Sequence, residues 1–443
     1  MIDKKKILFV HYRTGERDGV SLEIEKRAKV LEELGHTIEY LTGYDGLHRE
    51  NAHVIPLLDL KKSYNTFLRD HTFYHKMFDE NIMLTIFHDL ERRMRKEIKK
   101  VVIESKPDLI FVHNVFSHAY NLPFTSALLT VLDRYQIPTV AVHHDFWFER
   151  EAFCRPRYSF VEDLVESIPP NRPYILRHEI INSLAEKEVA NRRHIATKLT
   201  NDYFDFDTPP QKVDTYNKNL RHVLGIGKDD FVVLHATRIT NRKGIENAIR
   251  YCSALQKRLS PRPLTLLLPN FVEVDSREYA LALKKLALKL HVHTVWAADY
   301  FAAERMGING GKIYSLWDSY TIANLVTYTS LYEGFGNQLL EAIYFRLPTV
   351  IFEYPVYQKD IAAIGLTLIT LGSVAVRHNG FFYVPEDAIE KAVERTMALL
   401  GDKHELAKML THNEETAKAH YSSTYLRADL QTILSSIKLP ATV

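Results

Sequence analysis

Residues 332–342, YEGFGNQLLEA, place two glycines directly before an amphipathic helical pattern. Glycine lets the backbone approach a ligand closely, and a helix that begins near Gly336 presents unpaired N–H groups and a positive dipole end. Such a loop favours an anion such as a diphosphate. Glu333 lies on the loop and Glu341 lies within the helix. Because carboxylates accept charge-assisted hydrogen bonds, these two can each hold a pair of hydroxyl groups.

The segments on either side of this motif alternate between strands and helices. The apolar patterns predict strands over 231–236, 263–268, 323–328 and 348–352, and helices over 243–259, 276–290 and 336–345. The first half of the chain shows the same alternation, with strands over 6–11, 37–41, 108–113 and 138–143 and a helix over 124–135. A polar stretch over 205–230, which contains Pro209-Pro210, separates the two series.

Two successive α/β series predict an α/β protein with two Rossmann-like domains whose mostly parallel sheets face each other across a cleft. We expect a first domain over 1–208 and a second over 209–415. Ligands of such sheets bind at the carboxyl ends of the strands.

The composition is that of an ordinary globular protein. The 443 residues are 46% apolar and 25% charged, with a net charge of +2, so nothing in the overall charge favours nucleic acid as a partner. The two cysteines, Cys154 and Cys252, show neither disulfide nor zinc spacing. The apolar run over 7–10 is too short for a signal peptide, and we expect a cytoplasmic location.

The loop between the strand over 231–236 and its helix carries the second set of candidate residues. Arg238 is expected at the end of the strand and Lys243 in the first helical turn, so that both cations converge on phosphate oxygens. Arg242 lies nearby without a direction that the pattern defines.

With these two motifs in order, the sequence resembles the retaining, nucleotide-sugar-dependent glycosyltransferases of the GT-B fold, the family 4-like group that includes sucrose-phosphate synthase and bacterial mannosyl- and glucosyltransferases. The resemblance covers most of the chain and is strongest over 231–365. It implies that the segment 416–443 is helical and returns to the first domain, which fits the apolar spacing at Tyr425, Leu430, Ile433 and Ile437. One departure is that a frequent Gly-Gly pair of the family is Asp18-Gly19 here.

The resemblance also implies roles for the donor side. Glu333 would contact the hydroxyls of the transferred sugar, and Glu341 the ribose of the nucleotide. Arg238 and Lys243 would hold the diphosphate and take the place of a metal ion, since no DxD acidic pair ends an obvious strand. The residues expected to line the phosphate and sugar are Gly19, Gly334, Phe335, Gly336 and Asn337.

In the first domain, residues 142–150, VHHDFWFER, follow a strand and resemble the His-Asp element of the family. This places His144 near the donor sugar, with His143 as the alternative register. The residues expected on the acceptor side are His113, Asn114, His118, Asn121 and Asp145.

The expected function is therefore retaining, metal-independent transfer of a glucose- or mannose-class hexose from a nucleoside diphosphate sugar to an acceptor hydroxyl by a front-face mechanism. No cofactor is expected besides this co-substrate. Two alternatives stay open: a nucleotide-sugar-binding protein whose catalytic residues have decayed, and a sugar-nucleotide epimerase of the same architecture. The helix pattern around Arg92 to Lys100 is strongly basic, which indicates either a solvated face or a peripheral membrane contact.

Overall fold

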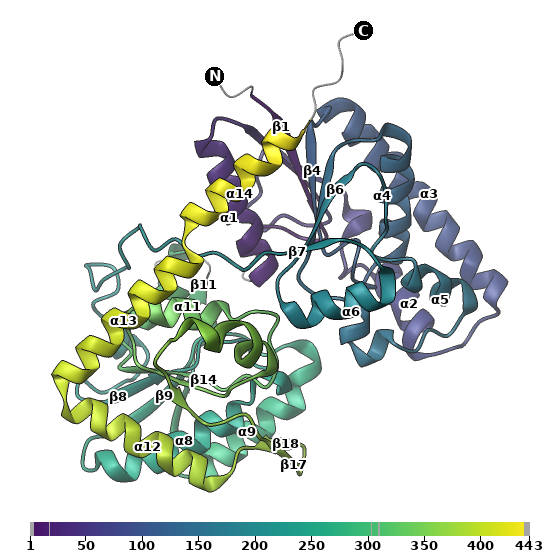
Figure 1. Ribbon diagram of the computed structural model, residues 1–443. Coiled ribbons are helices and arrows are strands. Elements are labelled where there is room, and N and C mark those ends of the chain that lie inside the picture. Colours follow the sequence, from purple (N-terminus) through teal and green to yellow (C-terminus); the bar gives the residue numbers. More distant parts are fainter. Residues whose placement is uncertain (1–3, 17, 303, 309–310, 438–443) are drawn as a thin grey trace. The chain divides into compact units, whose positions relative to one another are not determined.

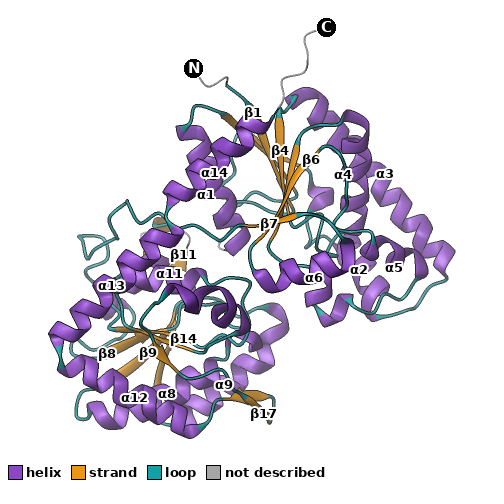
Figure 2. Cartoon of the chain, in the orientation of Figure 1, coloured by secondary structure: helices purple, strands orange, loops and turns teal. Residues whose placement is uncertain are grey.

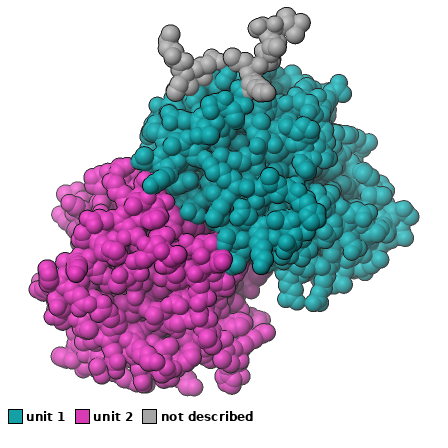
Figure 3. Space-filling view, viewed as in Figure 1, with its two compact units in different colours: residues 1–203, 423–443 teal, residues 204–422 magenta. Residues whose placement is uncertain are grey.

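The computed structural model describes residues 4–16, 18–302, 304–308 and 311–437. The chain forms two compact units (Figure 3): unit 1 consists of Met1–Tyr203 with Ser423–Val443, and unit 2 consists of Phe204–Ser422. Each unit contains a parallel sheet with helices packed on it, as Figure 2 shows, so the predicted α/β class is confirmed.

Within its described residues, unit 1 holds a seven-stranded parallel sheet in the order β3-β2-β1-β4-β5-β6-β7. In chain order the strands are β1 (Lys6–His11), β2 (Thr37–Thr42), β3 (Ala52–Val54), β4 (Leu109–His113), β5 (Thr139–His143), β6 (Ile175–Ile180) and β7 (Thr197–Leu199). Its helices are α1 (Gly19–Glu33), α2 (Ser63–Arg69), α3 (Glu80–Ser105), α4 (Leu122–Tyr135), α5 (Ser159–Glu166), α6 (Ser183–Arg193) and α14 (Ser423–Ser436).

The side chains of the central strands of unit 1 alternate between two hydrophobic cores, one on each face of the sheet. In unit 1, α3 and α4 lie on one face of the sheet and α1 and α14 on the other (Figure 1). Leu8 and Ile110 belong to the core under α3 and α4, whereas Phe9 and Phe111 belong to the core under α1 and α14. Because successive side chains of a strand point to opposite faces, a strand that is buried on both faces is apolar throughout. This is why β1 and β4 were recognisable in the sequence.

Unit 2 repeats this architecture. The part of it that the structure describes holds a six-stranded parallel sheet in the order β10-β9-β8-β14-β15-β16. Its strands are β8 (Phe231–Leu234), β9 (Leu264–Leu268), β10 (His293–Trp296), β14 (Leu325–Tyr328), β15 (Thr349–Ile351) and β16 (Ile369–Thr370). The helices are α7 (Leu220–Val223), α8 (Ile245–Leu259), α9 (Arg277–Lys289), α10 (Leu316–Thr321), α11 (Asn337–Tyr344), α12 (Glu386–Gly401) and α13 (Lys403–Tyr421).

Two small sheets accompany the main sheet of unit 2, and neither was anticipated. One consists of β11 (Phe301–Ala302), β12 (Met306–Ile308) and β13 (Gly311–Ser315), and the other is the hairpin of β17 (Val376–His378) and β18 (Phe381–Tyr383).

The boundary between the units lies at Tyr203/Phe204 rather than at the expected 208/209. Phe204 packs on aromatic residues of unit 2, with ring centroids 4.9 Å from Tyr344 and 6.0 Å from Trp317. The five residues before 209 therefore belong to the second unit.

The return of the chain to unit 1 begins at Ser423 rather than at residue 416, because α13 runs to Tyr421 within unit 2. The helix α14 packs against α1 through Leu426, Leu430 and Ile433. Tyr425, expected on the apolar face, is 54% exposed, so the buried stripe begins one residue later.

The basic stretch Arg92 to Lys100 lies on α3, where most of its side chains are exposed. Arg92 forms an ion pair with Asp89 at 2.6 Å, and Arg95 forms one with Glu91 at 3.6 Å. Acidic residues of the same helix thus neutralise part of its positive charge. Contact with a membrane surface stays a prediction. None of the described helices has the length and apolar character needed to cross a bilayer.

Candidate active site

The loops that follow β8 and β14 in unit 2 are hydrogen-bonded to each other. The Thr329 hydroxyl donates to the carbonyl oxygens of Lys243 at 3.1 Å and Gly244 at 2.9 Å. Gly244 has a φ of +56°, and a Cβ there would lie 2.4 Å from the carbonyl oxygen of Thr329. Only glycine tolerates both conditions. These contacts hold the short turn η5 (Asn241–Lys243) beside the loop that carries Glu333.

Glu333 lies between two cations. The Lys243 ammonium contacts Oε1, and Nη1 of Arg242 donates to Oε2 at 2.8 Å. Burial alone would raise the pKa of Glu333, but Lys243 and Arg242 outweigh it and lower the pKa to about 2. Burial also lowers the pKa of Lys243 to about 8, against the opposing effect of Glu333. At neutral pH one carboxylate thus faces two cations.

Arg238, which is expected to hold the diphosphate, forms an ion pair within unit 2. Its guanidinium lies 2.6 Å from the carboxylate of Glu273, and Arg242 takes the second position beside Glu333. The charge of Arg238 still reaches the site, since it helps to lower the pKa of Lys243. The sequence did not define the direction of the Arg242 side chain. The signal that could have identified it as a site residue is its position next to Lys243 in the same turn.

The glycine loop ends at the start of α11. Gly336 has a φ of +152°, and a Cβ there would lie 2.4 Å from the Tyr354 hydroxyl, which donates to the carbonyl oxygen of Phe335 at 2.5 Å. Phe335 itself is buried against Tyr421, so its ring belongs to the core and only its backbone stays available for a ligand.

The first turn of α11 has spare hydrogen-bonding capacity. Within the described residues no side chain caps its N-terminus, and Oδ1 of Asn337 has no hydrogen-bond partner. Unpaired groups of this kind at a helix start can receive an anion or a hydroxyl.

Glu341 lies one turn further along α11 and is half-buried. The hydroxyl of Tyr320, on α10, donates to its Oε2 at 2.5 Å. No pattern in the sequence pointed to Tyr320, because α10 lies in a different part of the chain.

In unit 1, histidines lie at the ends of β4 and β5. Nδ1 of His113 and Nε2 of His144 are 3.1 Å apart, and Oδ1 of Asn114 accepts from the backbone N–H of His144 at 2.7 Å. Burial lowers the pKa of His144 to about 4, so this pair is neutral at physiological pH. His143 pairs instead with His178 at 3.0 Å, so within this motif it is His144 that pairs with His113.

The remaining acceptor-side candidates differ in accessibility. Asp145 is half-buried and forms an ion pair with Arg150 at 2.8 Å. His118 is fully buried and stacks on Tyr120 with ring centroids 3.7 Å apart. Asn121 is 3% exposed and caps α4, accepting from the N–H of Phe124 at 3.2 Å. The burial of His118 and the capping role of Asn121 speak against direct contact with an acceptor.

Gly19 is the first residue of α1, and Asp18 is its N-cap. Oδ1 of Asp18 accepts from the N–H groups of Val20 and Ser21, both at 3.1 Å, and its Oδ2 lies 3.0 Å from Nε of Arg13. The Asp18 carboxylate thus occupies the N-terminus of α1, where a Gly-Gly pair would place no side chain. Across the described residues, no three His, Cys, Asp or Glu side chains gather as a metal site.

Comparison with known proteins identifies close relatives. A mannosylglucosylglycerate synthase of Petrotoga mobilis is 32% identical over 424 residues, which cover 91% of this chain and 95% of the relative. A mannosylglucosylglycerate synthase of Thermotoga maritima is 32% identical over 450 residues, which cover 98% of this chain and all of the relative.

The fold also matches solved structures. Anabaena HepE, solved in complex with UDP and glucose, aligns with a TM-score of 0.61 at 16% identity and covers 98% of this chain and 100% of its own. The family described as glycosyl transferases group 1 matches residues 217–417, which lie in unit 2 and include both loops of the candidate site. The chain belongs to the group 1 glycosyltransferases and has their GT-B fold.

Proposed function

We propose that this glycosyltransferase moves a mannose-class hexose from a nucleoside diphosphate sugar to a hydroxyl of glucosylglycerate, with retention of configuration and without a metal ion. The product named for the two relatives supports the choice of sugar and acceptor. The observation that carries the proposal is the ionised Glu333 held between Lys243 and Arg242, directly before the uncapped start of α11.

The donor's diphosphate would bind where positive charge exceeds negative charge. Lys243 and Arg242 bring two positive charges against the single carboxylate of Glu333, and the start of α11 adds N–H donors. Glu341 would hold the ribose diol and Glu333 the hydroxyls of the transferred sugar. Arg238 is paired with Glu273, so its positive charge would attract the diphosphate from a distance without contacting it directly.

In the reaction, the bond between the anomeric carbon and the diphosphate oxygen breaks, and a bond forms between that carbon and the acceptor oxygen on the same face. The proton of the acceptor hydroxyl passes to an oxygen of the leaving phosphate. Lys243 and Arg242 stabilise the negative charge that develops there, and Glu333 favours the positive charge that develops on the sugar ring.

In unit 1, we assign His144 to the donor sugar, and Asn114 and Asp145 to the acceptor. A neutral His144 carries one donor and one acceptor nitrogen, which suits a hydroxyl. What supports this part is the low pKa of His144, which keeps its ring neutral, and the bond from its backbone N–H to Oδ1 of Asn114, which holds the two residues together.

The direct test is a product assay with GDP-mannose, UDP-glucose and ADP-glucose as donors and glucosylglycerate as acceptor, with and without EDTA. We expect release of nucleoside diphosphate together with mannosylglucosylglycerate. NMR of the product should show that the new linkage has the same anomeric configuration as the donor. An inverted linkage would overturn the front-face route, and loss of turnover in EDTA that magnesium restores would overturn metal independence. Absence of any product would reject the function.

A further inference from the structure

The carboxylate of Glu341 is held by a buried tyrosine from another helix. The Tyr320 hydroxyl donates to Oε2 of Glu341 at 2.5 Å, and Tyr320 is only 2% exposed. Its ring stacks on Phe345, with centroids 4.8 Å apart and an angle of 14° between the planes. Since burial keeps water from competing for this bond, the tyrosine restricts the orientation of the carboxylate.

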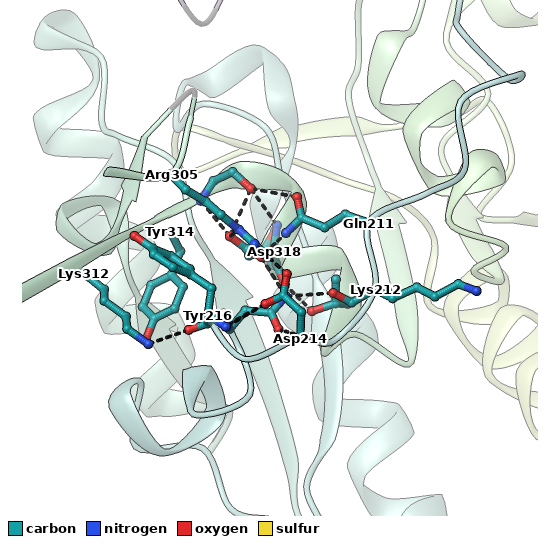
Figure 4. A network of polar contacts seen from close by, with 12 residues as sticks. Gln211, Lys212, Asp214, Tyr216, Arg305, Lys312, Tyr314 and Asp318 are labelled. Carbon is teal, nitrogen blue, oxygen red and sulfur yellow. Dashed lines mark hydrogen bonds and ion pairs between the residues drawn. The ribbon is translucent and has the colours of Figure 1, made fainter. Parts of the chain in front are cut away.

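The helix α10 that carries Tyr320 has only six residues and cannot hold its own position. Asp318 anchors it, as Figure 4 shows. This carboxylate is fully buried and accepts from Nη2 of Arg305 at 2.5 Å and from Nδ2 of Asn217 at 2.7 Å, with Gln211 as a further donor. It also accepts from the backbone N–H of Ser315 at 2.9 Å, which completes the cap of α10.

Arg305 is fixed in turn from two sides. Its Nη1 lies 2.6 Å from Oδ2 of Asp214, and its guanidinium lies 4.8 Å from the centroid of the Tyr216 ring. On the same ring, the Lys312 ammonium lies 4.9 Å from the centroid (Figure 4). A charged network with this many contacts makes α10 a rigid support rather than a surface turn.

We propose that Tyr320 is a positioning residue for the nucleoside end of the donor. It holds the Glu341 carboxylate in the orientation that receives the ribose diol, while Asp318 keeps α10 in place beneath it. The inference rests on the proposed function, which assigns the ribose to Glu341. It extends that function to a residue that makes no contact with the donor itself and acts through Glu341.

The experiment compares the binding of GDP, UDP and ADP by calorimetry in the wild type, Tyr320→Phe, Glu341→Gln and the double variant. Tyr320→Phe should weaken binding of the preferred nucleotide about tenfold, the lower end of the typical worth of one hydrogen bond to a charged group. The donor KM should rise by the same factor while kcat stays unchanged, because binding to the ribose is equal in the ground and transition states. The double variant should bind about as weakly as Glu341→Gln alone, because both changes remove the same contact.

Tyr251→Phe is the matched control. Tyr251 is a fully buried tyrosine of unit 2 whose hydroxyl pairs with Thr396 at 2.6 Å. This control should lose thermal stability as Tyr320→Phe does but keep the nucleotide affinity of the wild type, so that a merely structural effect is separated from positioning.

Unchanged affinity in Tyr320→Phe would overturn the inference while leaving the proposed function intact. Additive losses in the double variant, or a fall in kcat with an unchanged KM, would also overturn it. A wild type that binds none of the three nucleotides and makes no product would reject the proposed function, and the inference with it.

Discussion

The two units share a parallel-sheet architecture but differ in the charge of the candidate residues that they bury after their strands. In unit 1, His113 and His143 end neighbouring strands and are fully buried, and burial lowers the pKa of each well below its ordinary value. In unit 2, the loop after a strand buries Glu333 in its ionised form.

The difference lies in the partners that each unit supplies. His113 and His143 each pair with another histidine, so no opposite charge offsets the cost of burying an imidazolium there. Glu333 has Lys243 and Arg242, whose attraction exceeds the cost of burying the carboxylate. Unit 2 therefore presents a preorganised charged site, whereas the histidines that end β4 and β5 in unit 1 are neutral and hydrogen-bonding.

Removing the carboxylate from the charged site should have the largest effect. Glu333→Gln keeps the shape of the side chain but not its charge, so we expect kcat to fall by about 10²–10³-fold while nucleoside diphosphate still binds. Donor kinetics and nucleotide calorimetry measure the two quantities. Glu353→Gln is the control, because this carboxylate of unit 2 pairs with Thr370 at 2.7 Å outside the candidate site. A fully active Glu333→Gln enzyme would show that the site is misassigned.

Acid should destabilise unit 1 through its buried neutral histidines. A histidine whose pKa falls from 6.5 to about 4 on folding, as for His144 and His178, binds its proton more readily when unfolded. Its stabilising contribution is therefore present above pH 6.5 and is lost as the pH falls toward 4, by about 3 kcal/mol per histidine.

Thermal melts between pH 7 and pH 4 check this expectation. The variant that replaces both His143 and His178 by leucine should lose less stability over this range than the wild type does. Parallel pH dependence in the two proteins would contradict the assignment of these histidines as neutral.

A substitution of Glu341 tests how unit 2 binds the donor. If Glu341 holds the ribose, Glu341→Ala should raise the donor KM about tenfold with little change in kcat. Glu390→Ala, on the exposed surface of α12, should leave both constants at the wild-type values. A fall in kcat at unchanged KM would assign Glu341 to the chemical step instead.

The smallest expected effect concerns Asn121 in unit 1. As the N-cap of α4, it should contribute about 1 kcal/mol to the free energy of unfolding, which Asn121→Ala removes and Asn121→Ser largely retains. Denaturant unfolding measures this difference. The acceptor KM should not change in either variant, and an increase in Asn121→Ala would restore its expected role at the acceptor.

The fold was predictable wherever a strand is buried on both faces. The expected strand over residues 6–11 coincides with β1, since nothing polar interrupts it before His11. In contrast, β6 was missed because it contains Arg177 and Glu179. These charges are acceptable there only because Arg27 lies 2.8 Å from Glu179 and Asp429 pairs with Arg177, partners that come from opposite ends of the chain.

The candidate site was predictable to the level of the loops and not of their contacts. The spacing of Glu333 and Glu341 and the place of Lys243 at a helix start are local features, which a sequence displays directly. That Arg242 pairs with Glu333, and that Arg238 pairs with Glu273 from a different loop, depends on contacts between segments that are distant in the sequence.

The sequence by itself determined the two α/β series, the glycine loop before α11 and the residue types that suit a diphosphate and hydroxyl groups, because periodicity and local spacing are properties of neighbouring residues. Only the tertiary structure decided which partners meet: Tyr320 with Glu341, Arg242 with Glu333, and His144 rather than His143 with His113. Each of these contacts joins segments brought together by strand order and register. Their energies depend on burial and on the opposite charge nearby, and both exist only once the chain has folded.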